Sequence, residues 1–335
     1  MDRALRLQFH DLMVKTRALE LRMIAMVRSG DGYFWIGGPG EEAVNVALGL
    51  QVRKGEGIDY DYLLLHYRNT GMLMAMGIPL IDPIRLMRST ATDPFTRGRS
   101  FSGHYAYKPF NILPVTSPIG TQFGVAPGLA LAQKRAGSKG VTIVIGGDAG
   151  AAEPDFASGL IWATRPGREL PILFLITDNS LGISTRKDQV WAMEHISDRA
   201  KPFGIPTRVI DGNDPEASHA ALGEALETVR RTGRPYMIDA KVSRLYGHSS
   251  SSGTNLEPGE DPIARYEKKL VDEGIATPGE LKAVHERYHA EALAALEQVR
   301  LEPFPAPHTL YDHTFVPSPV DLVYGERYFN PNRGD

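Results

Sequence analysis

Two continuous runs of β-branched and aliphatic residues most constrain what this chain can fold into. Residues 141–147 read VTIVIGG and residues 171–177 read PILFLIT. An apolar run of this length, bounded by glycine or proline, is typical of a strand buried on both faces of a parallel sheet. Residues 153–165, between the two runs, have the spacing of a helix, so this region predicts a strand, a helix and a second strand.

The same pattern recurs further along the chain. Residues 206–212 and 234–245 predict two more strands, and residues 214–233 predict a helix between them. Pro215 suits the first turn of that helix and Gly233 suits its end. This order of elements predicts an α/β fold: a doubly wound parallel sheet flanked by helices, with right-handed crossovers.

Composition and the N-terminal segment exclude several classes of protein. The 335 residues are 42% hydrophobic and carry a net charge of −3, which fits a folded protein and argues against nucleic-acid binding. The absence of cysteine excludes disulfides, thiolate metal sites and a cysteine nucleophile. The sequence contains no run of 18 apolar residues, so we expect no membrane span. Residues 1–30 predict an amphipathic helix ending at Gly30 without a targeting signal, so we expect a cytoplasmic protein, or one whose presequence was removed before numbering began.

The C-terminal third has a different character. Residues 261–300 predict polar helices, whereas residues 303–335 are rich in proline and aromatic residues and have no clear period. A segment of the second kind is typical of a chain that wraps a surface. We expect a domain over residues 1–260 and a helical, proline-rich extension over residues 261–335, which packs on that domain or on a partner subunit.

Polar residues follow the first two buried strands at the point where each ends. The sequence GGDAG at 146–150 follows one strand, and TDNSL at 177–181 follows the other. In a parallel sheet these ends lie at one edge, where ligands bind. Asp148, Asn179 and the Leu181 carbonyl offer oxygen ligands, which Mg²⁺ prefers and commonly supplements with phosphate oxygens. The pattern predicts a magnesium–diphosphate site, with two ordinary strand-to-helix turns as the alternative.

Three further segments are candidates for the ligand side. The glycine-rich turn at 37–40 precedes a helix expected near Glu41, and it serves either as the entry to that helix or as a substrate-side loop. The helix expected near Glu153 directs its N-terminus toward the predicted phosphate. Residues 91–116 form a long loop rich in proline, glycine, serine and aromatic residues, and such loops are often functional.

Ordered blocks of sequence carry a family resemblance. GDAGAAEPDF (147–156) followed by DNSLGIS (178–184) resembles the thiamine diphosphate fingerprint. The blocks HYRNTGMLMAMGIPL (66–80), GRSFSGHYAYKPFNILPVTSPIGTQ (98–122) and SRLYGHSSSS (243–252) are similar to those of alpha subunits of the first, decarboxylating component of 2-oxo acid dehydrogenase complexes. The resemblance covers most of residues 1–300 and implies a thiamine diphosphate-binding fold.

The resemblance also implies roles for single residues. Asp148, Asn179 and the Leu181 carbonyl match the magnesium ligands, and His248 matches the catalytic histidine of a flexible active-site loop, which is phosphorylated in mitochondrial relatives. Arginine suits the diphosphate end because its fixed fork fits phosphate oxygens. The residues that match the cofactor contacts are Tyr67, Arg68, Ser117, Ile119, Gly147, Ala149, Gly150, Arg244 and His248.

The implied activity is thiamine diphosphate-dependent oxidative decarboxylation of a 2-oxo acid, followed by reductive acylation of a lipoyl domain. The implied cofactors are thiamine diphosphate and Mg²⁺, and a structural monovalent cation is a further expectation, with capping or turn roles as the alternative. Its ligands would come from Thr116, Ser117, Thr121 and Gln122. A beta subunit is expected to supply the activating glutamate, in an α2β2 heterotetramer.

The sequence leaves alternatives for both the substrate and the class of function. The HYAYK and GRSFSG segments favour a branched-chain 2-oxo acid over pyruvate. One rival function is another split thiamine diphosphate enzyme subunit, similar to a transketolase or a decarboxylase. The other is a non-catalytic interaction subunit, which is favoured only by departures from the fingerprint: its middle glycine is Ala149, and its Asn-Asn pair is Asp178-Asn179. An alanine at a position that needs a positive φ would be strained.

The remaining expectations concern the loop at 247–253 and the other histidines. Nothing in the sequence of this serine-rich loop pins it, so we expect the cofactor and the beta subunit to order it as a gate. His66 and His104 are candidates for the cofactor side, and Met72, Met74 and Met76 are expected to serve packing. Surface roles are expected for His285, His289, His308 and His313.

Overall fold

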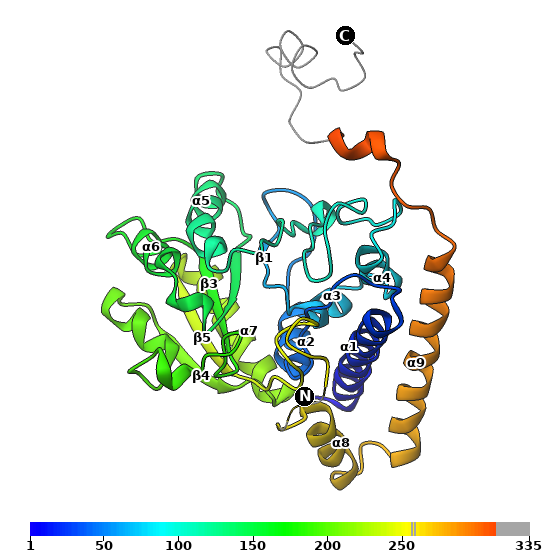
Figure 1. Cartoon of the computed structure of the whole chain (residues 1–335). Coiled ribbons are helices and arrows are strands. Elements are labelled where there is room, and N and C mark those ends of the chain that lie inside the picture. The colour runs from blue at the N-terminus through cyan, green and yellow to red at the C-terminus, as the bar shows by residue number, and fades with distance from the viewer. Residues whose placement is uncertain (256, 258, 313–335) are drawn as a thin grey trace, which may run out of the picture.

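The computed structural model describes residues 1–255, 257 and 259–312. Five strands form one sheet in the order β1-β2-β3-β5-β4, and every neighbouring pair is parallel (Figure 1). The strands are β1 (Tyr62–Leu64), β2 (Thr142–Gly147), β3 (Ile172–Asp178), β4 (Thr207–Asp211) and β5 (Tyr236–Lys241). The predicted α/β fold with a parallel sheet is confirmed.

Helices surround the sheet and extend it at both ends of the chain. The longer ones begin and end with the expected signals: the Asp214 side chain caps α7, and the left-handed Gly233 (φ 64°) ends it. The α-helices are α1 (Arg3–Ser29), α2 (Glu42–Gly49), α3 (Thr70–Ala75), α4 (Ile81–Met87), α5 (Thr121–Arg135), α6 (Pro154–Ala163), α7 (Pro215–Thr232), α8 (Pro262–Asp272) and α9 (Pro278–Arg300). Short 3₁₀ helices are η1 (Lys108–Phe110), η2 (Gly150–Ala152), η3 (Lys187–Gln189), η4 (Ile196–Phe203) and η5 (Pro307–Tyr311).

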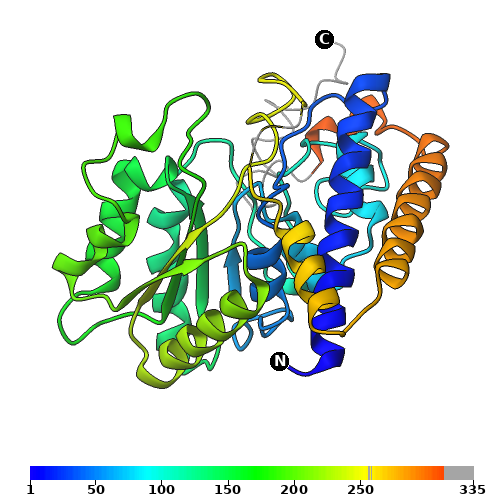
Figure 2. The ribbon, with the colours of Figure 1, turned by 90° about the horizontal axis from the view of Figure 1, so that it is seen from below.

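The apolar runs form strands because both of their faces are buried. Along β3, Leu173 and Leu175 belong to one hydrophobic cluster, whereas Phe174 and Ile176 belong to the other. This alternation is the two-residue period of a strand between two apolar layers. Side chains of α5 and α6 fill one cluster, and those of α2 and α7 contribute to the other. Figures 1 and 2 show these layers on opposite sides of the sheet.

The terminal helices form an outer layer. α1 packs against α2, α3, α8 and α9, and α9 lies on the side of α1 that faces away from the sheet (Figure 2). Polar contacts join them: Arg17 of α1 pairs with Asp261, which caps α8, at 2.8 Å, and Asp11 accepts a hydrogen bond from Tyr288 of α9 at 2.5 Å. None of the described helices is long and apolar enough to cross a membrane. Residues 313–335, which include His313 and most of the proline-rich segment, lie outside the described residues.

One predicted strand is shorter than expected. The run 234–245 forms a strand only as far as Lys241. Beyond that point β3 and β4 have also ended, so no neighbouring strand remains to pair with. The chain instead runs to the glycine-rich turn, where Leu245 donates its backbone N–H to the Pro39 carbonyl at 3.0 Å. Arg244 therefore lies in the connection after β5 and not in a strand.

Candidate active site

A cavity of about 600 Å³ lies at the carboxyl ends of β2 and β3. Its lining brings together nearly all the residues predicted to hold cofactor and metal. Those residues are Tyr67, Arg68, Ser117, Ile119, Gly147, Asp148, Ala149, Gly150, Asn179, Leu181 and His248. Arg244 lies beside the cavity, where its Nη1 donates to the carbonyl of the lining residue Gly182 at 2.6 Å. These residues meet because the carboxyl ends of neighbouring parallel strands lie at the same edge of the sheet.

The first acidic residue of the fingerprint is a buried carboxylate. Asp148 is 3% exposed, and burial, with a smaller contribution from nearby Asp178, raises its pKa to about 6. A carboxylate in such surroundings gains from a bound cation. Ala149 has φ −65°, so the alanine is unstrained. The left-handed residue of this region is Ser180, at φ 62°.

The two residues of the Asp178-Asn179 pair lie in different surroundings. Asp178 accepts hydrogen bonds from Lys187 and, at 2.6 Å, from Lys241. Burial acts to raise the pKa of Asp178, but these two lysines lower it. The Asn179 Oδ1 accepts the Leu181 backbone N–H at 3.1 Å, beside the cavity. The negative charge of Asp178 is thus balanced by two lysines of the same chain, whereas Asn179 and Leu181 line the cavity.

Two arginines and a histidine form the basic side of the cavity. Arg68 is 3% exposed and donates from Nη1 to the Gly37 carbonyl and from Nη2 to the His248 carbonyl at 3.1 Å. The same Nη2 lies 3.2 Å from His248 Nδ1. Because a guanidinium only donates, Nδ1 must accept, which leaves the proton of the neutral imidazole on Nε2. Burial, helped by Arg68 and Arg244, lowers the pKa of His248 to about 4.

Buried polar groups lie in and beside this cavity. His66 Nδ1 belongs to the lining and has no hydrogen-bond partner among the described residues, and the Glu41 carboxylate lies close to Thr177 and to the lining residue Asn179. Burial raises the pKa of Glu41 to about 7, against the opposing charge of Arg68. Buried polar groups are costly unless a partner or a ligand satisfies them, so the cavity suits a polar ligand.

Glu41 is a site residue that sequence reasoning took only as a helix start. Its neighbour Glu42 is committed elsewhere, since it accepts hydrogen bonds from Arg17 and from the Gly40 backbone at 2.5 and 2.7 Å. The sequence signal that could have identified Glu41 is the pair of consecutive acidic residues directly after the glycine-rich turn. Only one of the two can cap the N-terminus of the helix, so the other is available for another role.

The serine-rich loop is held within this chain, which corrects the expectation that nothing pins it. Ser250 donates its N–H to the Trp35 carbonyl at 2.8 Å, and the Ser250 hydroxyl accepts the Trp35 N–H at 3.1 Å. Gly247 is required here, because a Cβ at that position would lie 2.3 Å from the Gly253 carbonyl oxygen. Backbone pairing of this kind leaves no periodic mark in a sequence. Gating by cofactor and partner stays a prediction.

The segment predicted to hold a monovalent cation is only partly gathered. The hydroxyls of Thr116 and Thr121 lie 2.7 Å apart, and both donate toward the Pro118 carbonyl at 3.1 Å. Ser117 instead bonds His104 Nε2 at 2.7 Å, and Gln122 donates to the Ile145 carbonyl at 2.9 Å. The cation stays a prediction. His104 and His66 both line the cavity.

Trp35, which anchors the loop, is itself supported by a buried carboxylate. Its Nε1 donates to Glu20 at 2.7 Å, and Glu20 is fully buried. Burial raises the pKa of Glu20 from its ordinary 4.5 to about 7. The stability linked to this raised pKa is fully present below pH 4.5 and is lost as the pH rises to about 7, where an isolated charge must be buried.

We therefore expect Glu20→Gln, which keeps an acceptor for Trp35, to stabilise the protein at pH 8 by about 1–3 kcal/mol and to have little effect at pH 5. Urea unfolding at the two pH values measures the difference, with the exposed Glu291→Gln as the control. Equal effects of Glu20→Gln at pH 5 and pH 8 would show that the carboxyl is not the source of the pH dependence.

Comparison with known proteins assigns the chain to a family. The model of the dehydrogenase E1 component matches residues 10–308. The chain belongs to this family. It is 29% identical to the 2-oxoisovalerate dehydrogenase subunit alpha of Bacillus subtilis, over 90% of this chain and 93% of that protein. The mitochondrial counterpart from Homo sapiens is 27% identical over 90% of this chain and 71% of its own length.

A relative with another substrate in its name has nearly the same sequence identity over a smaller part of the chain. The pyruvate dehydrogenase E1 component subunit alpha of Staphylococcus aureus is 30% identical over 85% of this chain and 75% of its own length. The predicted resemblance to E1 alpha subunits is therefore confirmed. Membership of the family implies thiamine diphosphate as the cofactor and assembly with other components.

Proposed function

We propose that this chain is the alpha subunit of a 2-oxo acid dehydrogenase, active with a beta subunit and a lipoyl-domain acceptor. The observation that carries the proposal is the meeting of a buried carboxylate (Asp148), an amide (Asn179) and a buried guanidinium (Arg68) in one cavity at the strand ends. When bound, thiamine diphosphate supplies the carbanion chemistry that lets a 2-oxo acid lose carbon dioxide.

The residues divide into a metal side and a phosphate side. Asp148, Asn179 and the Leu181 carbonyl would hold Mg²⁺, which takes hard oxygen ligands. Arg68 and Tyr67 would hold the diphosphate. The guanidinium of Arg68 bonds two backbone carbonyls, and a dianionic partner would be a stronger acceptor than either.

The aminopyrimidine end would lie along the segment that contains Ser117 and Ile119. His248 would act as an acid and base in the cavity, because its neutral imidazole carries a proton on Nε2 that it can donate to developing negative charge and take back. The beta subunit would complete the site with the activating glutamate in an α2β2 heterotetramer. Apolar side chains exposed on α5 and α6 support a protein partner: Val125, Ile161 and Trp162.

We propose a branched-chain 2-oxo acid as the substrate in preference to pyruvate. The cavity lining includes the apolar side chains Phe34, Ile36 and Phe101, which suit a branched aliphatic group. Co-expression with a beta subunit from the same genome, followed by assay with 3-methyl-2-oxobutanoate and pyruvate, tests both claims. Higher kcat/KM for 3-methyl-2-oxobutanoate is expected, and preference for pyruvate would reverse the substrate assignment.

The same assay separates the rival functions. A split decarboxylase- or transketolase-like enzyme would bind thiamine diphosphate but would not acylate a lipoyl domain. A non-catalytic subunit would bind no cofactor in the assembled complex, and the unstrained Ala149 removes one of its two supports.

Arg68→Ala should weaken thiamine diphosphate binding by about 10- to 150-fold, because charge-assisted hydrogen bonds are worth roughly 1.5–3 kcal/mol. The control is Arg208→Ala, which removes an exposed arginine paired with Glu224 and should change affinity little. Calorimetric titration of the assembled complex measures both. An effect of Arg68→Ala below tenfold would place Arg68 outside the diphosphate contacts.

A further inference from the structure

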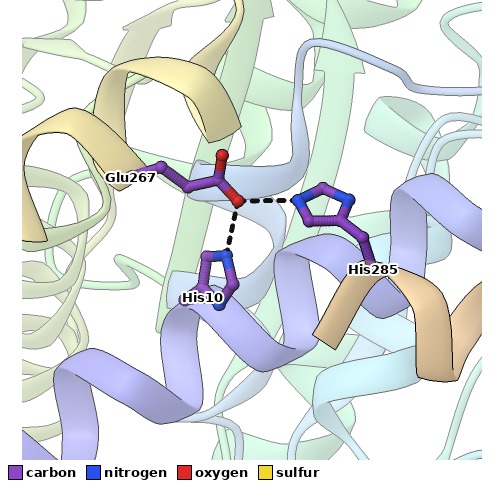
Figure 3. Close-up of side chains that lie close together, drawn as sticks. All are labelled: His10, Glu267 and His285. Atoms are coloured by element: carbon purple, nitrogen blue, oxygen red, sulfur yellow. Dashed lines mark hydrogen bonds and ion pairs between the residues drawn. The ribbon is translucent and has the colours of Figure 1, made fainter. Parts of the chain in front are cut away.

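Apart from the cavity, one cluster of metal-ligating side chains joins helices from opposite ends of the chain. His10 lies on α1, Glu267 on α8 and His285 on α9, and all three point toward one another in Figure 3. The Nε2 atoms of the two histidines lie 2.7 and 2.6 Å from the same atom, Oε1 of Glu267. His285 therefore does not have the simple surface role expected from the polar sequence around it.

The convergence of both imidazoles on one point is the geometry that a transition metal uses. Zn²⁺ binds histidine nitrogen at about 2.0–2.1 Å and carboxylate oxygen at about 2.0–2.2 Å, in a tetrahedron that sets its ligand atoms roughly 3.3 Å apart. The ligand atoms of the cluster all lie within 4.8 Å of one another. Moving the carboxylate back by about 0.7 Å from each nitrogen would make room for the ion. Imidazole ligands favour zinc and similar metals over magnesium.

One side of the cluster is buried in the protein and the other side is open to solvent. His10 is 2% exposed, whereas the His285 side chain is 43% exposed. Glu267 and His285 line a surface cavity of about 530 Å³, which leaves a position for water on the metal. The lysines of that cavity are paired: Lys268 with Asp272, and Lys282 with Glu286 at 3.2 Å.

The three side chains supply a ligand set that suits a divalent cation. The glutamate carboxylate offers an anionic oxygen, and each imidazole would bind the metal through Nε2 as its neutral tautomer, with the proton on Nδ1.

We propose that His10, Glu267 and His285 bind one Zn²⁺, or a divalent transition metal of similar chemistry, with water in the open position. The ion would tie α8 and α9 to α1, and through α1 to the helices on the sheet. This site is separate from the cofactor cavity, and it stands whether or not the proposed enzymatic function holds.

The test is zinc binding by the tag-free, full-length protein, measured by calorimetry in excess Mg²⁺ and by the visible absorption of the Co²⁺-substituted protein. Wild type should bind one Zn²⁺ per chain. His285→Ala should lower the affinity at least tenfold, because even the loss of a group that only orients a metal ligand costs about 10- to 100-fold. His289→Ala is the matched control: it removes an exposed imidazole one turn along the same helix and should bind zinc as wild type does.

Thermal unfolding gives a second readout. A hundredfold excess of Zn²⁺ over its Kd should raise the Tm of wild type and of His289→Ala by about 3–6 °C, but not that of His285→Ala or Glu267→Gln. Glu267→Gln keeps an acceptor for both histidines, so it retains their hydrogen bonds while weakening metal binding. Failure of wild type to bind zinc, or wild-type affinity in both cluster variants, would overturn the proposal and leave a hydrogen-bonded contact between helices.

Discussion

Replacement of Asp148 by alanine should abolish magnesium-dependent binding of thiamine diphosphate while leaving the fold intact. The carboxylate is buried at the end of β2, and burial raises its pKa to about 6, so in the free protein it is poorly stabilised as an anion. A divalent cation would supply the missing charge, and the metal would in turn hold the diphosphate. Loss of the carboxylate removes the one full negative charge among the three proposed ligands.

Calorimetric titration of thiamine diphosphate and Mg²⁺ into the assembled complex measures this effect. Asp188→Ala is the matched control, because it removes an exposed carboxylate that pairs with a neighbouring surface arginine, Arg186. We expect no measurable binding for Asp148→Ala and wild-type affinity for the control. Near wild-type affinity in Asp148→Ala, with unchanged circular dichroism, would remove Asp148 from the metal site.

Replacement of His248 by alanine should have the second large effect, and it should act on one step more than another. The variant should bind thiamine diphosphate normally, because Arg68 and the metal ligands remain. Reductive acylation of the lipoyl domain should fall by about 10²–10⁴-fold, the usual contribution of a positioned general acid or base. The first decarboxylation, followed with an artificial electron acceptor, should fall less. Small changes in both assays would make His248 a packed loop residue.

Limited proteolysis tests the gating of the loop that carries His248. Cleavage within residues 246–254 should slow when thiamine diphosphate and Mg²⁺ are added, since a diphosphate bound beside Arg68 would add contacts to the loop that Arg68 already holds at His248. The two hydrogen bonds between Ser250 and Trp35 already hold the loop in the free chain, so the change is expected to be graded. Equal cleavage rates with and without cofactor would contradict gating, even if His248 proved catalytic.

The parts of the fold that could be predicted are those that leave a periodic or positional mark. The apolar runs of β2 and β3 had to be buried strands, and the polar residues after them had to meet at one edge of a parallel sheet. The end of β5 depends instead on where its neighbours stop, so the predicted strand ran too far and included Arg244.

The contacts that escaped prediction join residues far apart in the sequence without any pattern. Ser250 pairs with Trp35 through one hydrogen bond between backbone atoms and one to the serine hydroxyl, and neither leaves a periodic mark in the sequence. His10 meets Glu267 and His285 only because α1 packs against α8 and α9. Glu41 looked like a helix start, and its burial beside Asn179 and Arg68 became visible only when the glycine-rich turn was placed against the strand ends.

The central claim is that the ends of β2 and β3 hold the metal that binds the diphosphate. Anomalous diffraction from crystals of the assembled complex, with Mn²⁺ in place of Mg²⁺ and with thiamine diphosphate bound, tests it most directly. We predict one strong manganese peak in the cavity within bonding distance of an Asp148 carboxylate oxygen, Asn179 Oδ1 and the Leu181 carbonyl oxygen, with diphosphate oxygens completing its coordination. A manganese peak elsewhere, or a bound diphosphate that contacts neither Asp148 nor Asn179 through the metal, would contradict the account.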